Sequence, residues 1–250
     1  MAIALTVGGI SACSTAEQHA STRATASALS APVLSAPDAI ARATKAVSGY
    51  RSVTIHATVN LNGGITLTGR VGWPTMAADL KEHLAALGTM RTLIVGSVMY
   101  QNYPETTGAV VDGKNWVSND LAATGPGKNS KNSQAAAIAA GYPVTGRDPL
   151  VQLKLLTVAT GVKRLGVESV DGVPATHYRG ALASSDGDAG TLDAWIGRDN
   201  LPVRVIRSVR SGQDVFSDRT DYSGYSLDTL TVTPPPARET IDSKAIGTLG

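Results

Sequence analysis

The sequence is poor in cysteine and in aromatic residues, and it has no long apolar run. Its single cysteine, Cys13, excludes an internal disulfide, and no Cys/His spacing resembles a zinc site. Three Trp, seven Tyr and one Phe occur in 250 residues, so the apolar mass is mostly Val, Leu, Ile and Ala. No stretch approaches the roughly 20 apolar residues of a membrane-spanning helix, so we expect none.

The charge pattern also lacks a marked feature. Charged residues make up 17% of the chain, the formal net charge is +2, and both signs are scattered along the sequence. The absence of a basic block excludes nucleic acid as an expected partner, and no acidic tail is present. The hydrophobic fraction of 42% is enough to bury a sizeable core.

The place of Cys13 gives the first positive indication of function. A short apolar run at residues 2–9 and the small residues Ser11 and Ala12 precede it, which resembles the lipobox of bacterial lipoproteins. This predicts a signal peptide at residues 1–12 and a thiol that receives a diacylglyceryl group. Because only twelve residues and no Lys or Arg precede Cys13, we interpret the printed start as lying downstream of the true one. A lone cysteine in an ordinary apolar N-terminus is the alternative.

A segment rich in Ser, Thr, Ala and Pro follows the cysteine. Residues 13–37 have linker composition, and as a flexible coil the 24 residues after Cys13 span roughly 25–30 Å. We therefore predict a lipidated tether and a folded domain at residues 38–250. The expected location is the extracytoplasmic face of the cell membrane, held by the acyl anchor.

The first half of the domain alternates like a β-protein after one helix. Asp38 is a good N-cap for a helix over 38–48. Residues 52–61 alternate apolar and polar, and Asn62-Gly63-Gly64 predicts a turn into a second strand. Residues 76–88 have helical propensity but lie between strands, so we favour a strand. Two strands about Gly96-Ser97 and a short one near 114–120 follow.

The second half begins with an irregular segment. Residues 122–147 are rich in Gly, Asn, Ser and Ala, with a short helix at 133–140, and we interpret them as a functional flap or as disorder. Asp148 and Pro149 then start an apolar helix. The last third is a run of strands with turns at Asp171-Gly172, Asp199-Asn200 and Ser211-Gly212, and three prolines near the end stop any ladder.

These elements predict an α+β, mainly β fold: a curved antiparallel half-barrel sheet with a few helices covering its concave face. One face of such a sheet can be wet, but the apolar face needs a cover. Since few helices are available, the cover is expected to be incomplete and to leave a hollow.

Several of these segments resemble a known group. VESVDGVPATHYRGAL and LDAWIGRDNLPVRV, with LIVGSVMYQNYP and DPLVQLKLL, are similar to hairpins and the internal helix of actinobacterial LppX/LprG-like lipoproteins, within the LolA/LolB-like superfamily. The resemblance covers roughly residues 38–243. It implies a half-barrel with an apolar cavity that accepts acyl chains. It also implies a carrier or chaperone role for lipid or lipidated molecules in the cell envelope.

The same resemblance implies candidate ligand-binding residues. They are Val53, Ile55, Leu67, Leu93, Val95, Leu150, Leu153 and Leu156. No cofactor and no metal are required. For each residue, ordinary core packing is the competing interpretation.

Enzyme chemistry has little support in the sequence. No GxSxG elbow, HExxH motif or phosphate-binding loop occurs. His19 lies in the tether, His83 is unassigned, and His56 and His177 occupy polar strand positions, where we expect solvated side chains. Asp186 and Asp188 lack the remaining ligands of a calcium loop. The serious alternative is an envelope sensor or protein-interaction module that uses the same fold, with an envelope protein as its partner.

Overall fold

The computed structural model describes residues 34–60, 64–73, 75–85, 88–102, 113–121, 146–182, 189–211 and 214–246. The chain divides into two units, Met1–Val33 and Leu34–Gly250, and every element below belongs to the second. Cys13, His19, most of the predicted tether, the predicted helix at 133–140, and Asp186 and Asp188 lie outside the described residues.

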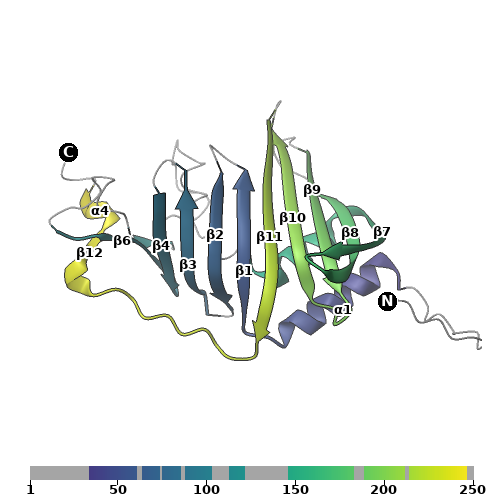
Figure 1. Ribbon diagram of the computed structural model, residues 1–250, viewed down its shortest axis with the longest axis horizontal. Helices are drawn as coiled ribbons and strands as arrows, with labels where there is room; N and C mark the ends of the chain where they lie inside the picture. Colours follow the sequence, from purple (N-terminus) through teal and green to yellow (C-terminus); the bar gives the residue numbers. More distant parts are fainter. Residues whose placement is uncertain are drawn as a thin grey trace, which may run out of the picture. The chain divides into compact units, whose positions relative to one another are not determined.

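One twelve-stranded sheet forms the described domain, in the spatial order β12-β6-β5-β4-β3-β2-β1-β11-β10-β9-β8-β7 (Figure 1). The β12–β6 pair is parallel, and the other neighbours are antiparallel. The predicted class, a mainly β protein with one open curved sheet and a few helices, is confirmed. The strands are β1 (Ser52–Asn60), β2 (Ile65–Gly72), β3 (Ala77–Leu84), β4 (Gly88–Val95), β5 (Val98–Asn102), β6 (Trp116–Asp120), β7 (Thr160–Val170), β8 (Val173–Leu182), β9 (Ala189–Gly197), β10 (Pro202–Ser211), β11 (Asp214–Ser226) and β12 (Thr240–Asp242).

The strand β1 shows how alternation builds the core. Val53, Ile55 and Ala57 are at most 1% exposed, whereas His56 between them is exposed as predicted. Ile55 lies opposite Tyr222 of β11, and the buried face continues from these strands into one apolar cluster. We call this the inner face of the sheet and the opposite one the outer face.

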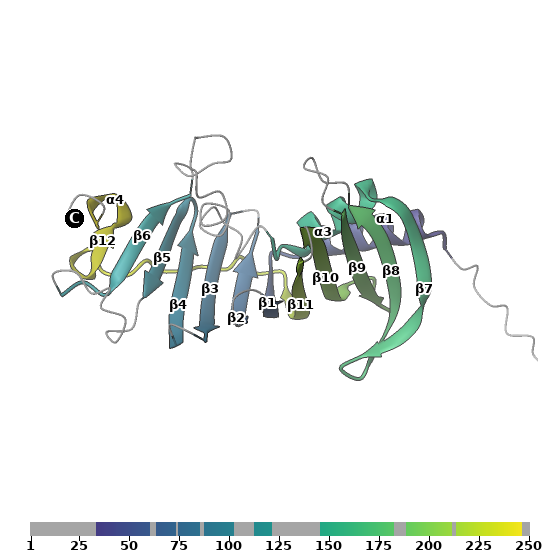
Figure 2. The same ribbon diagram turned by 90° about the horizontal axis from the view of Figure 1, so that it is seen from above.

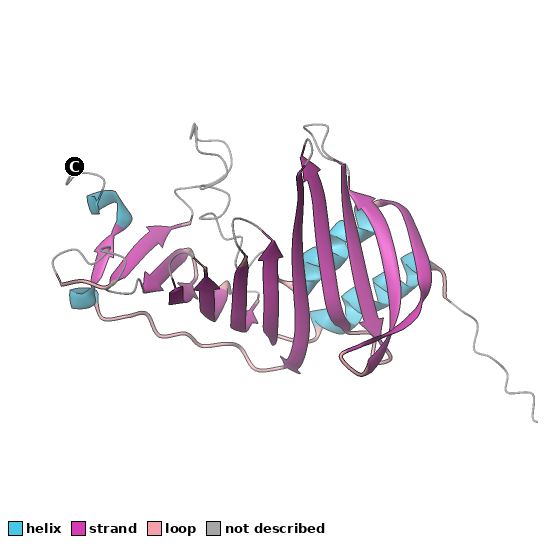
Figure 3. Ribbon diagram, turned by 45° about the horizontal axis from the view of Figure 1, so that its top comes forward, coloured by secondary structure: helices cyan, strands magenta, loops and turns pink. Residues whose placement is uncertain are grey.

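Two helices, α1 (Ala36–Ser48) and α3 (Pro149–Val158), pack against each other and onto the inner face. Their contacts with the sheet include β7, β8 and β9. Figures 2 and 3 show both helices behind these strands, with α1 running from beside β7 toward β1. Of the helices that the structure describes, none combines the length and the apolar character needed to cross a membrane.

The two helices begin in different ways. Asp148 caps α3 as predicted, because its carboxylate accepts the backbone N–H of Leu150 at 2.8 Å. For α1 the predicted cap was wrong: Ser35 is the cap, and its hydroxyl accepts the backbone N–H of Asp38 at 3.3 Å. Asp38 lies inside the first turn, where a negative charge also favours the helix.

The ambiguous segment at 76–88 contains strand β3, as we favoured. Ala78 and Leu80 are fully buried, whereas Lys81 and His83 are exposed. β3 pairs along its whole length with β2 on one side and β4 on the other. These two ladders, which depend on residues outside the segment, outweigh its local helical propensity.

The end of the chain adds a strand that we did not predict. Residues 229–236, which contain the three prolines, form no ladder, as expected. Beyond them come a short 3-10 turn η2 (Ala237–Glu239), strand β12 and helix α4 (Ser243–Ile246), and β12 pairs in parallel with β6. Figure 1 shows the preceding segment running past β1 to β4 to reach this edge. We call residues 227–236 the C-terminal strap.

Candidate functional site

The inner face holds six of the eight predicted ligand-binding residues. Val53, Ile55 and Leu67 of the sheet meet Leu153 and Leu156 of α3 in the same apolar cluster, each at most 4% exposed. Leu150 is half-buried and packs against them. These residues, far apart in the sequence, therefore form one apolar surface.

Leu93 and Val95 do not belong to this surface. Their neighbour Ile94 is in the inner-face cluster, so the alternation of β4 places Leu93 and Val95 on the outer face. The run Leu93-Ile94-Val95 is apolar throughout, and periodicity alone cannot tell its inner residue from its outer ones. Leu93 is buried there because the C-terminal strap crosses the outer face beside it.

A polar cluster, which we did not predict, interrupts the apolar inner face. Arg147, just before α3, is 1% exposed, and its Nη2 lies 3.1 Å from Oδ1 of Asp218 on β11. Glu82 of β3 occupies an inner position in line with Leu80, and burial raises its pKa despite the opposing effects of Thr92 and the Arg147 charge. Glu82 continues the inner-facing alternation of Ala78 and Leu80, and a charged residue in such a series was the signal for this cluster.

Further polar groups surround this cluster without complete pairing. Gln152 of α3 is 4% exposed and donates to the carbonyl of Gly146, but its Oε1 has no hydrogen-bond partner. The Tyr222 hydroxyl is buried and likewise has none, and burial holds its pKa far above the usual range. Buried polar groups without partners are costly, so these atoms are suited to a polar group that enters from outside.

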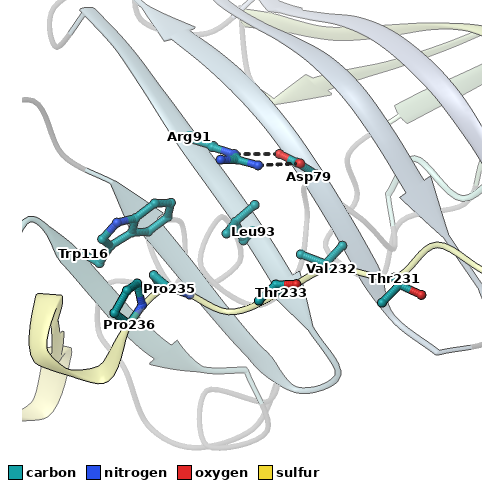
Figure 4. A pocket seen from close by; sticks show the side chains of 9 residues that line it. All are labelled: Asp79, Arg91, Leu93, Trp116, Thr231, Val232, Thr233, Pro235 and Pro236. Atoms are coloured by element: carbon teal, nitrogen blue, oxygen red, sulfur yellow. Dashed lines mark hydrogen bonds and ion pairs between the residues drawn. The ribbon is translucent and has the colours of Figure 1, made fainter.

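The outer face carries a groove of about 420 Å3 between the sheet and the C-terminal strap (Figure 4). Arg91 of β4 donates two hydrogen bonds, of 2.9 and 2.7 Å, to the carboxylate of Asp79 on β3, and these bonds raise the pKa of Arg91. The groove is lined by Asp79, Arg91, Leu93, Trp116, Thr231, Val232, Thr233, Pro235 and Pro236.

His177, on the outer face of β8, is not the solvated side chain that we predicted. It is 5% exposed and stacks on Trp195 with ring centroids 4.0 Å apart. Its Nδ1 lies 2.9 Å from Oε1 of Glu168 and its Nε2 lies 2.6 Å from Oδ1 of Asp193, so each ring nitrogen faces a carboxylate. The alternation of β8 placed His177 on the outer face, but it could not show that β7 and β9 supply partners there.

The outer-face cluster has the features of a structural network. Trp195 donates its indole N–H to Glu168 at 2.8 Å, and the hydrogen bonds from Trp195 and His177 lower the pKa of Glu168. Arg179 donates to Asp193 at 2.6 Å. Among the described residues, no group of three or more His, Cys, Asp or Glu side chains is arranged to hold a metal ion.

Comparisons with known proteins agree with this fold. No family model matches the chain. A Streptomyces coelicolor protein named as a lipoprotein, SCO4650, is 25% identical over 237 residues, which cover 86% of this chain and 79% of the relative. An uncharacterized 31.2 kDa protein of Streptomyces griseus is also 25% identical, over 74% of this chain, and the chain spans only 65% of that relative's length.

The open curved sheet with helices on its inner face also occurs in a crystal structure. The lipoprotein LppX of Mycobacterium tuberculosis matches with a TM-score of 0.54 and 16% identity, over 78% of this chain and 97% of LppX. The chain therefore has the LppX fold, and the resemblance noted in its sequence is confirmed at that level.

Proposed function

We propose that the protein is an extracytoplasmic lipoprotein, anchored through Cys13, that binds a hydrophobic ligand as a carrier or chaperone in the cell envelope. The observation that supports this most is the inner face. Its apolar cluster extends from β8 and β9 through β1 to Leu80 on β3 and Ile94 on β4. The sheet contacts of α1 and α3 include β7, β8 and β9, which lie at one end of this cluster. The LppX fold and the lipoprotein relative support the same proposal.

The ligand is held by shape and apolar burial in this proposal. Val53, Ile55 and Leu67 form the floor, and Leu150, Leu153 and Leu156 of α3 form the opposite wall. Burying a few hundred Å2 of acyl chain at about 25 cal/mol per Å2 contributes several kcal/mol to binding without covalent chemistry. We accordingly assign no catalytic residue, cofactor or metal.

The polar cluster would orient a ligand in this site, because it offers partners to the polar end of the ligand. Oε1 of Glu82, Oε1 of Gln152 and the Tyr222 hydroxyl are buried beside the apolar surface and lack partners. A ligand with an apolar chain and a polar end satisfies both parts of the face, since its polar atoms replace hydrogen bonds that are otherwise missing. We therefore expect an amphiphile such as a lipid rather than a pure hydrocarbon.

Native mass spectrometry of the chain purified from an actinobacterial host tests ligand binding. We expect copurifying lipid, and we expect Leu150→Trp to reduce its occupancy severalfold because the indole fills the space beside α3. Val95→Trp is the matched control, since Val95 is also half-buried but lies on the outer face. A clean protein mass, with no uptake of added lipid by the wild type, contradicts the proposal.

The anchor has its own test. Acylation at Cys13 adds a diacylglyceryl mass to the mature chain and places the protein in the membrane fraction. Cys13→Ser should abolish both without changing the unfolding transition of the domain. An unmodified thiol in the native host would remove the anchor from the proposal and leave the ligand site untouched.

The alternative, a sensor or protein-interaction module, is favoured by a specific observation. The five innermost candidate residues are nearly inaccessible to water, which is also the property of an interior filled by side chains. The outer groove, with Trp116 and Pro236 beside the Arg91–Asp79 pair, then becomes the binding surface. Loss of partner capture from envelope extracts on Trp116→Ala, with lipid absent from the wild type, would support this alternative.

A further inference from the structure

One edge of the sheet exposes apolar side chains to solvent. Leu165 and Val167 of β7 are 42% and 61% exposed, Val173 at the start of β8 is 45% exposed, and Val158 at the end of α3 is 78% exposed. They are four of the six large apolar residues that the structure describes as exposed. We call this set the β7 edge. Exposed apolar side chains along one edge make that edge a candidate interaction surface.

The β7 edge also carries exposed positive charge. Lys163 and Arg164 of β7 and Lys154 of α3 are exposed. The nearby carboxylates of Glu168 and Asp171 are already bound, Glu168 to His177 and Trp195 and Asp171 to Arg204. Lys154 interacts through its charge with Asp148 at the start of α3, and Arg164 interacts with Tyr178 of β8. The edge is therefore suited to an anionic partner.

The backbone of β7 is unsuited to the addition of another strand. Its register against β8 shifts twice, between Thr160 and Lys163 and between Arg164 and Gly166, and Gly161 and Gly166 have φ of 61° and 153°. Such bulges take the free N–H and C=O groups out of a regular ladder, and edge cations oppose strand pairing further. A partner that contacts apolar and cationic side chains without forming a β-ladder therefore suits this edge better than another strand does. An anionic lipid surface has that chemistry.

The chain also enters the domain on this side. α1 contacts β7, and it begins at Ala36, two residues after the first described residue, Leu34. Figures 1 and 2 agree that the start of α1 lies beside β7 and that its end lies toward β1. The described part of the chain therefore begins next to the β7 edge.

We infer that the β7 edge, together with Lys154, Lys163 and Arg164, docks the domain on an anionic bilayer. The inference rests on the proposed lipoprotein function, since an acyl anchor keeps this edge near lipid. Docking on this edge holds the end of the helix pair, and with it the wall of the proposed ligand site, against the membrane surface.

Vesicle cosedimentation of the full chain carrying Cys13→Ser tests the docking without the anchor. We expect binding to phosphatidylglycerol/phosphatidylethanolamine vesicles, and little to phosphatidylcholine vesicles. Lys163→Glu should weaken binding about tenfold, which corresponds to about 1.4 kcal/mol, because it removes a surface cation and puts an anion in its place. Separately, the pair Leu165→Ser and Val167→Ser should weaken binding about tenfold because it removes apolar contact with the bilayer. The control pair Val215→Ser and Leu227→Ser alters exposed apolar residues elsewhere and should leave binding unchanged.

A fluorophore attached to Leu165→Cys in the Cys13→Ser chain locates the contact. Its emission should shift to the blue with anionic vesicles, whereas the same label at Leu227→Cys should not respond. Absence of vesicle binding by the Cys13→Ser chain overturns the inference, even if Cys13 is acylated in the host. A wild-type dimer that Leu165→Ser and Val167→Ser convert to monomer, measured by light scattering, overturns it in favour of a second copy of the chain. An unacylated Cys13 with intact vesicle binding instead removes only the anchor.

Discussion

Arg147 lies with its Nη2 3.1 Å from Oδ1 of Asp218, and this ion pair is buried between the start of α3 and strand β11. The guanidinium side chain is 1% exposed and the carboxylate side chain 9%. A pair so far from water fixes where α3 begins on the inner face, because either charge alone would be buried without its partner. The wall of the proposed ligand site is therefore positioned by a polar contact as well as by apolar packing.

We predict that Arg147→Met lowers the free energy of unfolding by about 3–5 kcal/mol, because it leaves the Asp218 carboxylate buried with one cation fewer. Urea denaturation monitored by circular dichroism measures the change. Arg91→Met is the matched control: its pair with Asp79 is about half exposed, and the expected loss is at most about 1 kcal/mol. Equal losses in the two variants would contradict the structural role given to Arg147.

Glu82→Gln should stabilise the protein at neutral pH. Burial raises the pKa of Glu82 in the folded state, so folding favours its protonated form. Its contribution to stability is therefore fully present below the unfolded value of about 4.3 and is lost as the pH rises through the folded pKa. The side-chain amide introduced by Glu82→Gln does not titrate, so the substitution removes this loss of stability at neutral pH. The free energy of unfolding, measured from pH 4 to 8, should decline less with rising pH in the variant than in the wild type. A steeper decline in the variant would contradict the burial of the Glu82 carboxyl.

Sequence periodicity predicted most of the elements because their signals are local. The alternation in β1, the Asp148-Pro149 start of α3 and the turn at Asp171-Gly172, where both residues have positive φ, each depend on a few neighbouring residues. Strand β3 could not be predicted from local signals alone, because its own residues favour a helix. Its ladders with β2 and β4 make it a strand.

The candidate site was predicted less completely, for two physical reasons. In an uninterrupted apolar run such as Leu93-Ile94-Val95, the inner residue is defined by which strand or strap covers each face, and that cover comes from residues 227–236 far along the chain. Partners of buried polar residues are equally remote: Arg147 meets Asp218, and His177 meets Asp193. Strand β12 escaped prediction because it has three residues and its ladder with β6 joins segments far apart in the sequence.

Glu168→Gln should flatten the loss of stability in acid. Hydrogen bonds from Trp195 and His177 lower the pKa of Glu168 in the folded state. Its contribution is thus present above the unfolded value of about 4.3 and disappears as the pH falls through the lower folded pKa. The wild type should exceed the variant in stability at pH 7, and the two should converge in acid. A constant difference across the titration would show that the carboxylate charge is not involved.

Gly180→Ala tests how closely α3 approaches the sheet. A Cβ at Gly180 of β8 would lie 2.7 Å from the Cβ of Ala159 and 3.0 Å from a methyl carbon of Leu156. The helix would have to move away from the strand, so we expect a loss of about 1–3 kcal/mol in unfolding free energy. Ala181→Val, at the exposed neighbouring position, should change stability by less than about 0.5 kcal/mol. If lipid occupies the inner face, Gly180→Ala should also alter its retention in native mass spectra, because Leu156 belongs to the wall that is displaced.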